Sequence, residues 1–177
     1  MNGFRRLASL MVVALIWSCV VAYAQAPSAD AKPDTTPEVK PNFSGRWRMD
    51  KDKSDFATFH MPDVVVQVVD HHDPTLNIHT VETAGKKTTT ADVSYFTDGT
   101  ISKNILNGRD AESKAFWDGP ALNIRTTEKD SKGEDVVIED RWELSSDGET
   151  LTRTSHIITP KGSVDMKLVS EKEKSTS

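Results

Sequence analysis

The chain has 177 residues, of which 36% are apolar and 28% are charged, and its formal net charge is -5. This balance is typical of one globular domain and excludes a disordered polymer or a membrane protein with many spans. The excess of acidic residues leaves no basic footprint of the kind that DNA or RNA binding needs.

The N-terminal segment has the pattern of a secretory signal peptide. Arg5 and Arg6 form a basic start, residues 7–21 are almost all apolar, and residues 22–24 (Ala-Tyr-Ala) match a cleavage site. The apolar stretch is shorter than the roughly 20 residues that a membrane-spanning helix needs. We therefore predict cleavage after Ala24 and export to the periplasm or the medium, with an uncleaved anchor as the alternative.

Cys19 is the only cysteine of the chain. Residues 16–18 before it resemble a lipobox only loosely, so we do not predict a lipoprotein anchored through Cys19. A chain cut after Ala24 contains no cysteine, so it must fold by core packing without disulfides. Thiol catalysis and cysteine-based zinc sites are excluded for the same reason.

Residues 25–41 contain four prolines and one large aliphatic residue, Val39, which is the composition of a flexible linker or tail. We place the folded domain at residues 42–172 and a disordered tail at residues 173–177.

Within the domain, short runs rich in Val, Ile, Thr and aromatic residues recur between turn signals, and no segment keeps a helical period. Asn-Gly and Asp-Gly pairs supply the positive φ of tight hairpin turns, and connections this short allow only antiparallel neighbours. The pattern predicts about ten strands, at 43–49, 63–71, 75–83, 88–96, 100–106, 111–117, 121–128, 135–144, 150–159 and 163–171. We therefore predict an all-β fold, an antiparallel up-and-down meander that closes into a barrel because closure removes exposed strand edges.

The last two hairpins also predict which side chains share a face. A two-residue loop at Asp147-Gly148 pairs Leu144 with Leu151, Trp142 with Arg153, Asp140 with Ser155, and Ile138 with Ile157. The same device at Lys161-Gly162 pairs Ile157 with Met166, Ser155 with Leu168, and Arg153 with Ser170. Both hairpins put the same side chains inside.

Other apolar residues are interpreted as core. The Asp98-Gly99 turn pairs Phe96 with Ile101 and turns Tyr95 outward. The predicted core residues are Phe96, Ile101, Trp117, Leu122 and Ile124. A ten-stranded barrel leaves room inside for a ligand, so the same apolar side chains can form the core and line a pocket.

Residues 43–49 (FSGRWRM), followed by 53–56 (KSDF), resemble the opening of the calycin group, the lipocalins and fatty-acid-binding proteins, whose first strand carries G-x-W. Residues 117–119 (WDG) are similar to a hairpin of the fatty-acid-binding branch. The stretch 42–172 looks most like bacterial secreted lipocalin-like proteins. The resemblance implies a barrel that binds a small hydrophobic ligand, and it makes Trp47 a plug of the barrel base.

The sequence departs from the fatty-acid-binding branch in two places. Residues 50–62 are too few for that branch's two-helix lid, and residues 167–169 read Lys-Leu-Val where the branch has an Arg-x-Tyr clamp. In the wider group a basic side chain from a late strand stacks on the G-x-W tryptophan. Lys167, Lys172 and Arg141 are all candidates for that cation.

The sharpest local signal is a charged cluster on the predicted inner face, where a charge is costly unless it is paired or meets a ligand. In one interpretation Arg153 binds an anionic head group, Trp142 packs on the ligand, and Asp140 and Ser155 orient the guanidinium. In the other, Arg153 pairs with Asp140 and stacks on Trp142 to seal the barrel end. Trp117 completes the candidate ligand-binding residues.

The sequence offers no catalytic or metal signature. The five histidines show no metal-ligand spacing, and neither a nucleophile elbow nor a Gly-rich phosphate loop occurs. We predict no metal, no cofactor and no reaction.

We therefore predict an exported monomer that binds a small hydrophobic or amphipathic molecule non-covalently, an inference that rests largely on analogy between folds. An alternative is an interaction protein, such as a periplasmic protease inhibitor that presents residues 25–41. A third possibility is an isomerase of the lipocalin-like kind, which would need a titratable pair inside the barrel.

Overall fold

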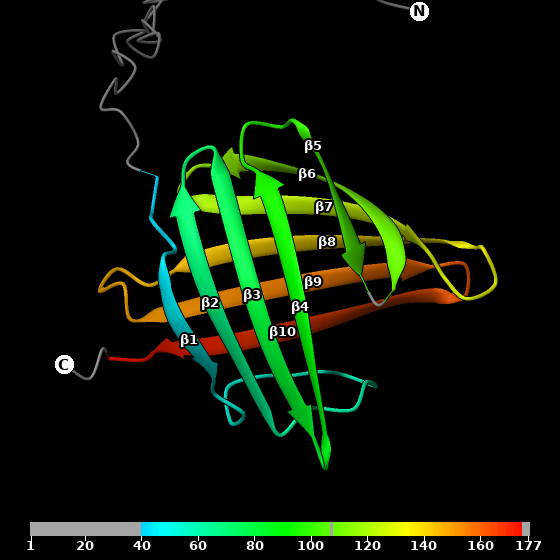
Figure 1. Cartoon of the computed structure of the whole chain (residues 1–177), viewed down its shortest axis with the longest axis horizontal. Helices are drawn as coiled ribbons and strands as arrows, with labels where there is room; N and C mark the ends of the chain where they lie inside the picture. Colours follow the sequence, from blue (N-terminus) through cyan, green and yellow to red (C-terminus); the bar gives the residue numbers. More distant parts are fainter. Residues whose placement is uncertain (1–39, 107, 175–177) are drawn as a thin grey trace, which may run out of the picture. The chain divides into compact units, whose positions relative to one another are not determined.

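The computed structural model describes residues 40–106 and 108–174, and in these ranges it contains ten strands and no helix. The strands are β1 (Gly45–Met49), β2 (Val64–His72), β3 (Thr75–Ala84), β4 (Lys87–Phe96), β5 (Ile101–Leu106), β6 (Arg109–Asp118), β7 (Ala121–Lys129), β8 (Asp135–Leu144), β9 (Thr150–Thr159) and β10 (Gly162–Lys172) (Figure 1). Each predicted strand is present, and the all-β meander is confirmed.

All ten strands belong to one antiparallel sheet with the order β4-β3-β2-β1-β10-β9-β8-β7-β6-β5. Strands that follow each other in the chain are neighbours in the sheet, except β4 and β5, which are not paired. In addition β1 pairs with β10, with Trp47 opposite Lys172. This pairing curls the meander into a barrel and leaves β4 and β5 as its two edges. Figure 1 shows β4 and β5 diverging from the turn that joins them, so the barrel is nearly closed rather than fully closed.

The hairpin between β8 and β9 has the predicted register. Leu144 lies opposite Leu151, and Trp142 lies opposite Arg153. The Asp147-Gly148 turn sets this register because Gly148 takes a φ of +74°, which costs little without a β-carbon.

The predicted register of the β9–β10 hairpin is wrong by two residues. A loop at 161–162 would put Pro160 in the ladder, where it has no N–H to donate. The turn instead starts at Pro160, and Ser155 lies opposite Met166 rather than Leu168. Because a shift of two residues preserves the face of every side chain, the predicted inner face is unaffected.

The turn at 97–100 forms, but the hairpin ladder predicted from it is absent. The N–H of Thr97 donates to the carbonyl of Pro74, and the N–H of Gly99 donates to the carbonyl of Ala115, so neighbouring strands hold both sides of the turn. Phe96 and Ile101, which we predicted as core, are therefore 42% and 48% exposed. Tyr95, whose face was ambiguous because the Asp98-Gly99 register turns it outward, is 8% exposed and packs in the core.

Trp47 closes the base of the barrel, where it is fully buried and its indole N–H donates to the carbonyl of Phe43 at 2.9 Å. Lys172 is the cation that stacks on it, with Nζ 5.2 Å from the ring centroid. Lys167 and Arg141, the other candidates, lie on the outer face of their strands.

Several predicted segments lie outside the described residues. These are the signal peptide 1–24, nearly all of the linker 25–41, and the last three residues of the tail. Across residues 40–106 and 108–174, no helix is long and apolar enough to cross a membrane.

Candidate functional site

The barrel encloses a cavity of about 260 Å³ between its base and its mouth. Strands from both halves of the meander contribute apolar walls, from Val65 and Ile78 on one side to Ile138 and Ile157 on the other. Its polar lining consists of Gln67, Thr80, Glu82, Tyr95, Thr126, Asp140, Arg153 and Ser155. An apolar chamber with a few convergent polar groups is the usual form of a small-molecule site.

Four of the five sequence-predicted site residues line this cavity together. Trp142 and Asp140 come from β8, and Arg153 and Ser155 come from β9, where they lie opposite each other in two cross-strand pairs. The turn between the two strands brings them together by fixing the register, with the N–H of Gly148 donating to the carbonyl of Ser145 at 2.9 Å. Trp117 is not in this lining.

The charged groups do not form the internal ion pair that one interpretation of the sequence required. Ser155 donates its hydroxyl hydrogen to Asp140 in a short hydrogen bond. Among the described residues, Arg153 makes no ion pair with Asp140 and no cation–π contact with Trp142. The carboxylate is therefore satisfied by a neutral partner, and the guanidinium remains available.

Two hydrogen-bond donors in the cavity wall have no partner among the described residues. Nε of Arg153 and Nε1 of Trp142 are both buried and both unbonded. An unsatisfied buried donor costs about 1 to 3 kcal/mol, so two of them on paired residues of neighbouring strands are unfavourable. Acceptors on a bound molecule would offset this cost.

Tyr95 also lines the cavity, although it is not among the residues predicted from the sequence. It reaches the cavity from β4, and burial raises the pKa of its hydroxyl to about 12, with Asp140 adding to the rise and Arg153 opposing it. The phenol is therefore neutral and can donate a hydrogen bond. The alternation of Val93 and Tyr95 along β4 was the available signal, but the assumed pairing with β5 reversed its face.

Trp117 lies at the closed end of the barrel, in a stack with Phe43 and His71. The Phe43 and Trp117 ring centroids are 5.8 Å apart with 6° between their planes, and His71 is 5.9 Å from Trp117. The Trp117 indole N–H donates to Asp73 at 3.2 Å. This residue seals the barrel base with Trp47 instead of facing the cavity.

His71 anchors the chain where it enters the barrel. Its Nδ1 accepts the N–H of Phe43 at 3.2 Å, and its side chain is only 3% exposed. Burial lowers the pKa of His71, with a smaller opposing effect from Asp73, whose carboxylate is 4.0 Å from Nε2. His71 is therefore neutral, with its hydrogen on Nε2.

The opposite end, the mouth, is covered by the connection between β1 and β2. Phe56 from this connection packs against Met49, Val65 and Leu168. Ser54 fixes the connection, because its hydroxyl donates to the carbonyl of Asp50 at 2.6 Å and accepts the N–H of Val169 at 3.0 Å.

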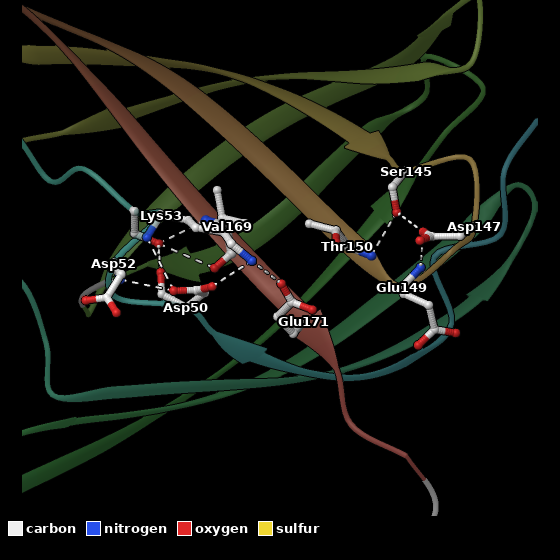
Figure 2. Close-up of polar contacts among 10 residues, drawn as sticks. Asp50, Asp52, Lys53, Ser145, Asp147, Glu149, Thr150, Val169 and Glu171 are labelled. Carbon is white, nitrogen blue, oxygen red and sulfur yellow. Dashed lines mark hydrogen bonds and ion pairs between the residues drawn. The ribbon is translucent and has the colours of Figure 1, made fainter.

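A charge network reinforces the same connection, as Figure 2 shows. Nζ of Lys53 lies 2.6 Å from Glu171 and 3.0 Å from Asp50. These two carboxylates raise the pKa of Lys53. A short loop, held by these ion pairs and hydrogen bonds, therefore covers the mouth. It has too few residues to form a helical lid.

A larger hollow of about 960 Å³ lies on the outer face of β6–β10. Several of its polar side chains already pair with one another. Arg141 is 2.9 Å from Asp118, and His156 is 2.6 Å from Asp165. A ligand would gain less binding free energy from charges that are already paired and hydrated than from the unbonded donors inside the barrel. Within the described residues, no group of three His, Cys, Asp or Glu side chains could hold a metal ion.

No protein-family model and no curated protein matches the chain. Solved structures do match. A secretory abundant heat soluble protein from Ramazzottius varieornatus superposes with a TM-score of 0.53 and 16% identity, over 77% of this chain and 98% of that chain. The zebrafish ileal bile acid-binding protein complexed with cholic acid gives 0.52 and 16%, over 74% and 98%. Apo lipid binding protein 8 of Caenorhabditis elegans gives 0.52 and 12%, over 74% and 95%.

At this level of identity the similarities establish the fold alone. The chain has a β-barrel fold similar to that of these proteins, in agreement with the fold that the resemblance of its G-x-W strand implied.

Proposed function

We propose that this protein is an exported carrier that binds a small amphipathic molecule inside the barrel, with an anionic head group at Arg153. The observation that carries the proposal is the pair of buried, unbonded donors on Trp142 and Arg153, which lie opposite each other in the cavity wall. A carboxylate has two acceptor oxygens, and a charge-assisted bond to Arg153 is stronger than a neutral one. Tyr95 is a third donor within the same cavity.

Two further observations support the proposal. Among the proteins of similar fold, one is complexed with cholic acid and another is named a lipid binding protein. The cavity of about 260 Å³ is at the small end of ligand pockets, which favours a short apolar tail. Decanoate is therefore a suitable probe.

The test is a titration with decanoate and decanol by calorimetry, using the wild-type chain and Arg153→Gln. The variant should bind decanoate about 10- to 100-fold more weakly, because a hydrogen bond to a charged group contributes about 1.5 to 3 kcal/mol. Decanol should lose much less. Arg125→Gln is the matched control, since Arg125 lies on the outer face of β7 and is exposed.

Unchanged decanoate affinity together with lower stability of Arg153→Gln would contradict the proposal and make Arg153 a structural residue. Deletion of residues 25–39 separates the carrier from the tail-inserting inhibitor. A carrier keeps its decanoate affinity in the deleted chain, whereas an inhibitor loses its activity.

Export is the second part of the proposal, and the basic start, the apolar stretch and the Ala-Tyr-Ala site of residues 5–24 support it. N-terminal sequencing of the protein from fractionated host cells tests it. We expect a chain that begins at Gln25 outside the cytoplasm. A chain that keeps residue 5 or stays in the cytoplasm would contradict export without affecting the binding proposal.

A further inference from the structure

The seam between β4 and β5 differs from every other strand boundary of the described barrel. Each of the other neighbouring pairs is held by a backbone ladder, whereas β4 and β5 form the two ends of the sheet order. The strands leave a shared turn and diverge from it (Figure 1). The barrel wall is therefore weakest along this line.

Side chains replace the missing ladder near the turn. The amide of Asn104 pairs with the backbone of Ser94, accepting its N–H at 2.8 Å and donating to its carbonyl at 3.0 Å. The hydroxyl of Ser102 accepts the N–H of Phe96 at 2.8 Å. These three hydrogen bonds imitate strand pairing, but two side chains from the six-residue β5 provide all of them.

The interior cavity reaches this seam from inside. Ala91 and Val93 of β4 and Leu106 of β5 all line the cavity, so the two edges form part of its wall. On the outside a second hollow of about 550 Å³ spans the same seam, from Asp92 of β4 to Asn104 of β5. Asn104 thus lies between the solvent and the chamber.

The mouth is a poorer route. Phe56 fills it by packing on Met49, Val65 and Leu168, and Ser54 and Lys53 tie its loop to β10. Opening the mouth would separate Phe56 from the three apolar side chains on which it packs. Opening the seam breaks three hydrogen bonds whose groups water can satisfy.

We propose that the ligand enters and leaves the barrel through the seam between β4 and β5, with the side-chain amide of Asn104 acting as its latch. This inference rests on the proposed function, since it assumes binding inside the barrel. It adds the route by which the molecule reaches the site. Neither Asn104 nor Ser102 lines the cavity, so the latch affects the barrier to exchange and not the contacts of the bound state.

The test compares exchange kinetics of decanoate in Asn104→Ala and Ser54→Ala, using stopped-flow displacement of a fluorescent fatty acid. Each change removes a side chain that bonds to the backbone of a neighbouring segment, one at the seam and one at the mouth. Asn104→Ala should raise both the association and the dissociation rate constants about tenfold, with Kd changed less than twofold. Ser54→Ala should leave both rate constants within twofold of the wild type.

Faster exchange in Ser54→Ala, or unchanged rates in Asn104→Ala, would overturn the proposed route. Hydrogen exchange of the wild-type chain tests it without any variant. At high pH, where every opening leads to exchange, the amide hydrogens of Ser94 and Phe96 should exchange at least as fast as decanoate dissociates. Slower exchange under that condition would overturn the proposal as well. Absence of decanoate binding to the wild-type chain would instead contradict the proposed function itself, so the two failures are distinguishable.

Discussion

Lys172 of the last strand lies over the indole of Trp47 on the first strand, with 5.2 Å between Nζ and the ring centroid. The two residues are also opposite each other in the β1–β10 ladder. A β-carbon on Gly45 would lie 2.7 Å from Cε of Lys172, so Gly45 gives the lysine side chain the space to reach the ring. The glycine, the tryptophan and the lysine form one unit that closes the barrel base.

This geometry predicts coupling between Gly45 and Lys172. Lys172→Ala should lower the free energy of unfolding by about 1 kcal/mol through loss of the cation–π contact. Gly45→Ala should cost more in the wild-type background than in Lys172→Ala, because part of its effect is displacement of the lysine. Urea unfolding of the four chains of the cycle measures this, and strictly additive losses would contradict it.

The buried histidine at the closed end predicts a stability change in mild acid. Since the pKa of His71 is lowered below its ordinary value of 6.5, folding favours the neutral ring. The stabilisation is fully present above pH 6.5 and is lost as pH falls through the folded-state pKa. The free energy of unfolding, measured in urea, should therefore decrease between pH 7.5 and pH 5.

His71→Asn should remove most of this decrease, and His72→Asn should retain it, because His72 is exposed on the outer face. An equal pH dependence in both variants would assign the effect to other groups.

Asp73 affects the stability in a separate range of pH. A hydrogen bond from Thr97, with help from Lys40 and Trp117, lowers the pKa of Asp73 to about 2, so its contribution is lost only below pH 4.

A buried hydroxyl pair in the cavity region predicts a rescue. Ser113 and Thr126 are each 2% exposed and share a hydrogen bond of 2.8 Å. Ser113→Ala leaves the threonine hydroxyl unsatisfied and should destabilise the fold by about 1 to 3 kcal/mol. The double change Ser113→Ala with Thr126→Val should recover most of that loss in thermal or urea unfolding. A double variant less stable than Ser113→Ala would show that packing dominates.

Because Phe56 lies at the mouth, its removal should change which length of fatty-acid chain the barrel prefers. Phe56→Ala removes an aromatic ring that lines the cavity and should cost roughly 2 kcal/mol of stability, less than for a fully buried phenylalanine. It also lengthens the chamber. Relative to decanoate, tetradecanoate should bind better to the variant than to the wild-type chain in calorimetry. An unchanged ratio of the two affinities would place the bound tail elsewhere in the barrel.

The strands could be predicted from the sequence because the residue types in the turns between them determine the turn conformation locally. Asp147-Gly148 fixes the β8–β9 register through positive φ, and that register brought Trp142, Asp140, Arg153 and Ser155 to one wall. Such a turn acts over a few residues, so it can be recognised without knowledge of the rest of the chain.

The predictions were wrong where contacts between residues far apart in the sequence determine the structure. The turn before Ile101 looks like a hairpin, but β4 pairs only with β3 and β5 pairs only with β6, so no ladder joins β4 to β5. Tyr95 therefore faces inward and Phe96 outward, the reverse of the local prediction. The stack of His71 on Trp117 likewise joins residues 46 positions apart, which no spacing rule connects.

The ladder between β1 and β10 has a consequence for the order in which the molecule assembles. Strand β1 is made first and its partner last, with more than a hundred residues between Trp47 and Lys172. The base of the barrel therefore cannot be finished while the ribosome still holds the C-terminal strand. Contacts of such long sequence separation also slow folding, because the intervening chain must be ordered before they form. Until β10 is made, β1 can pair only with β2, so one of its two backbone edges stays open to a chaperone.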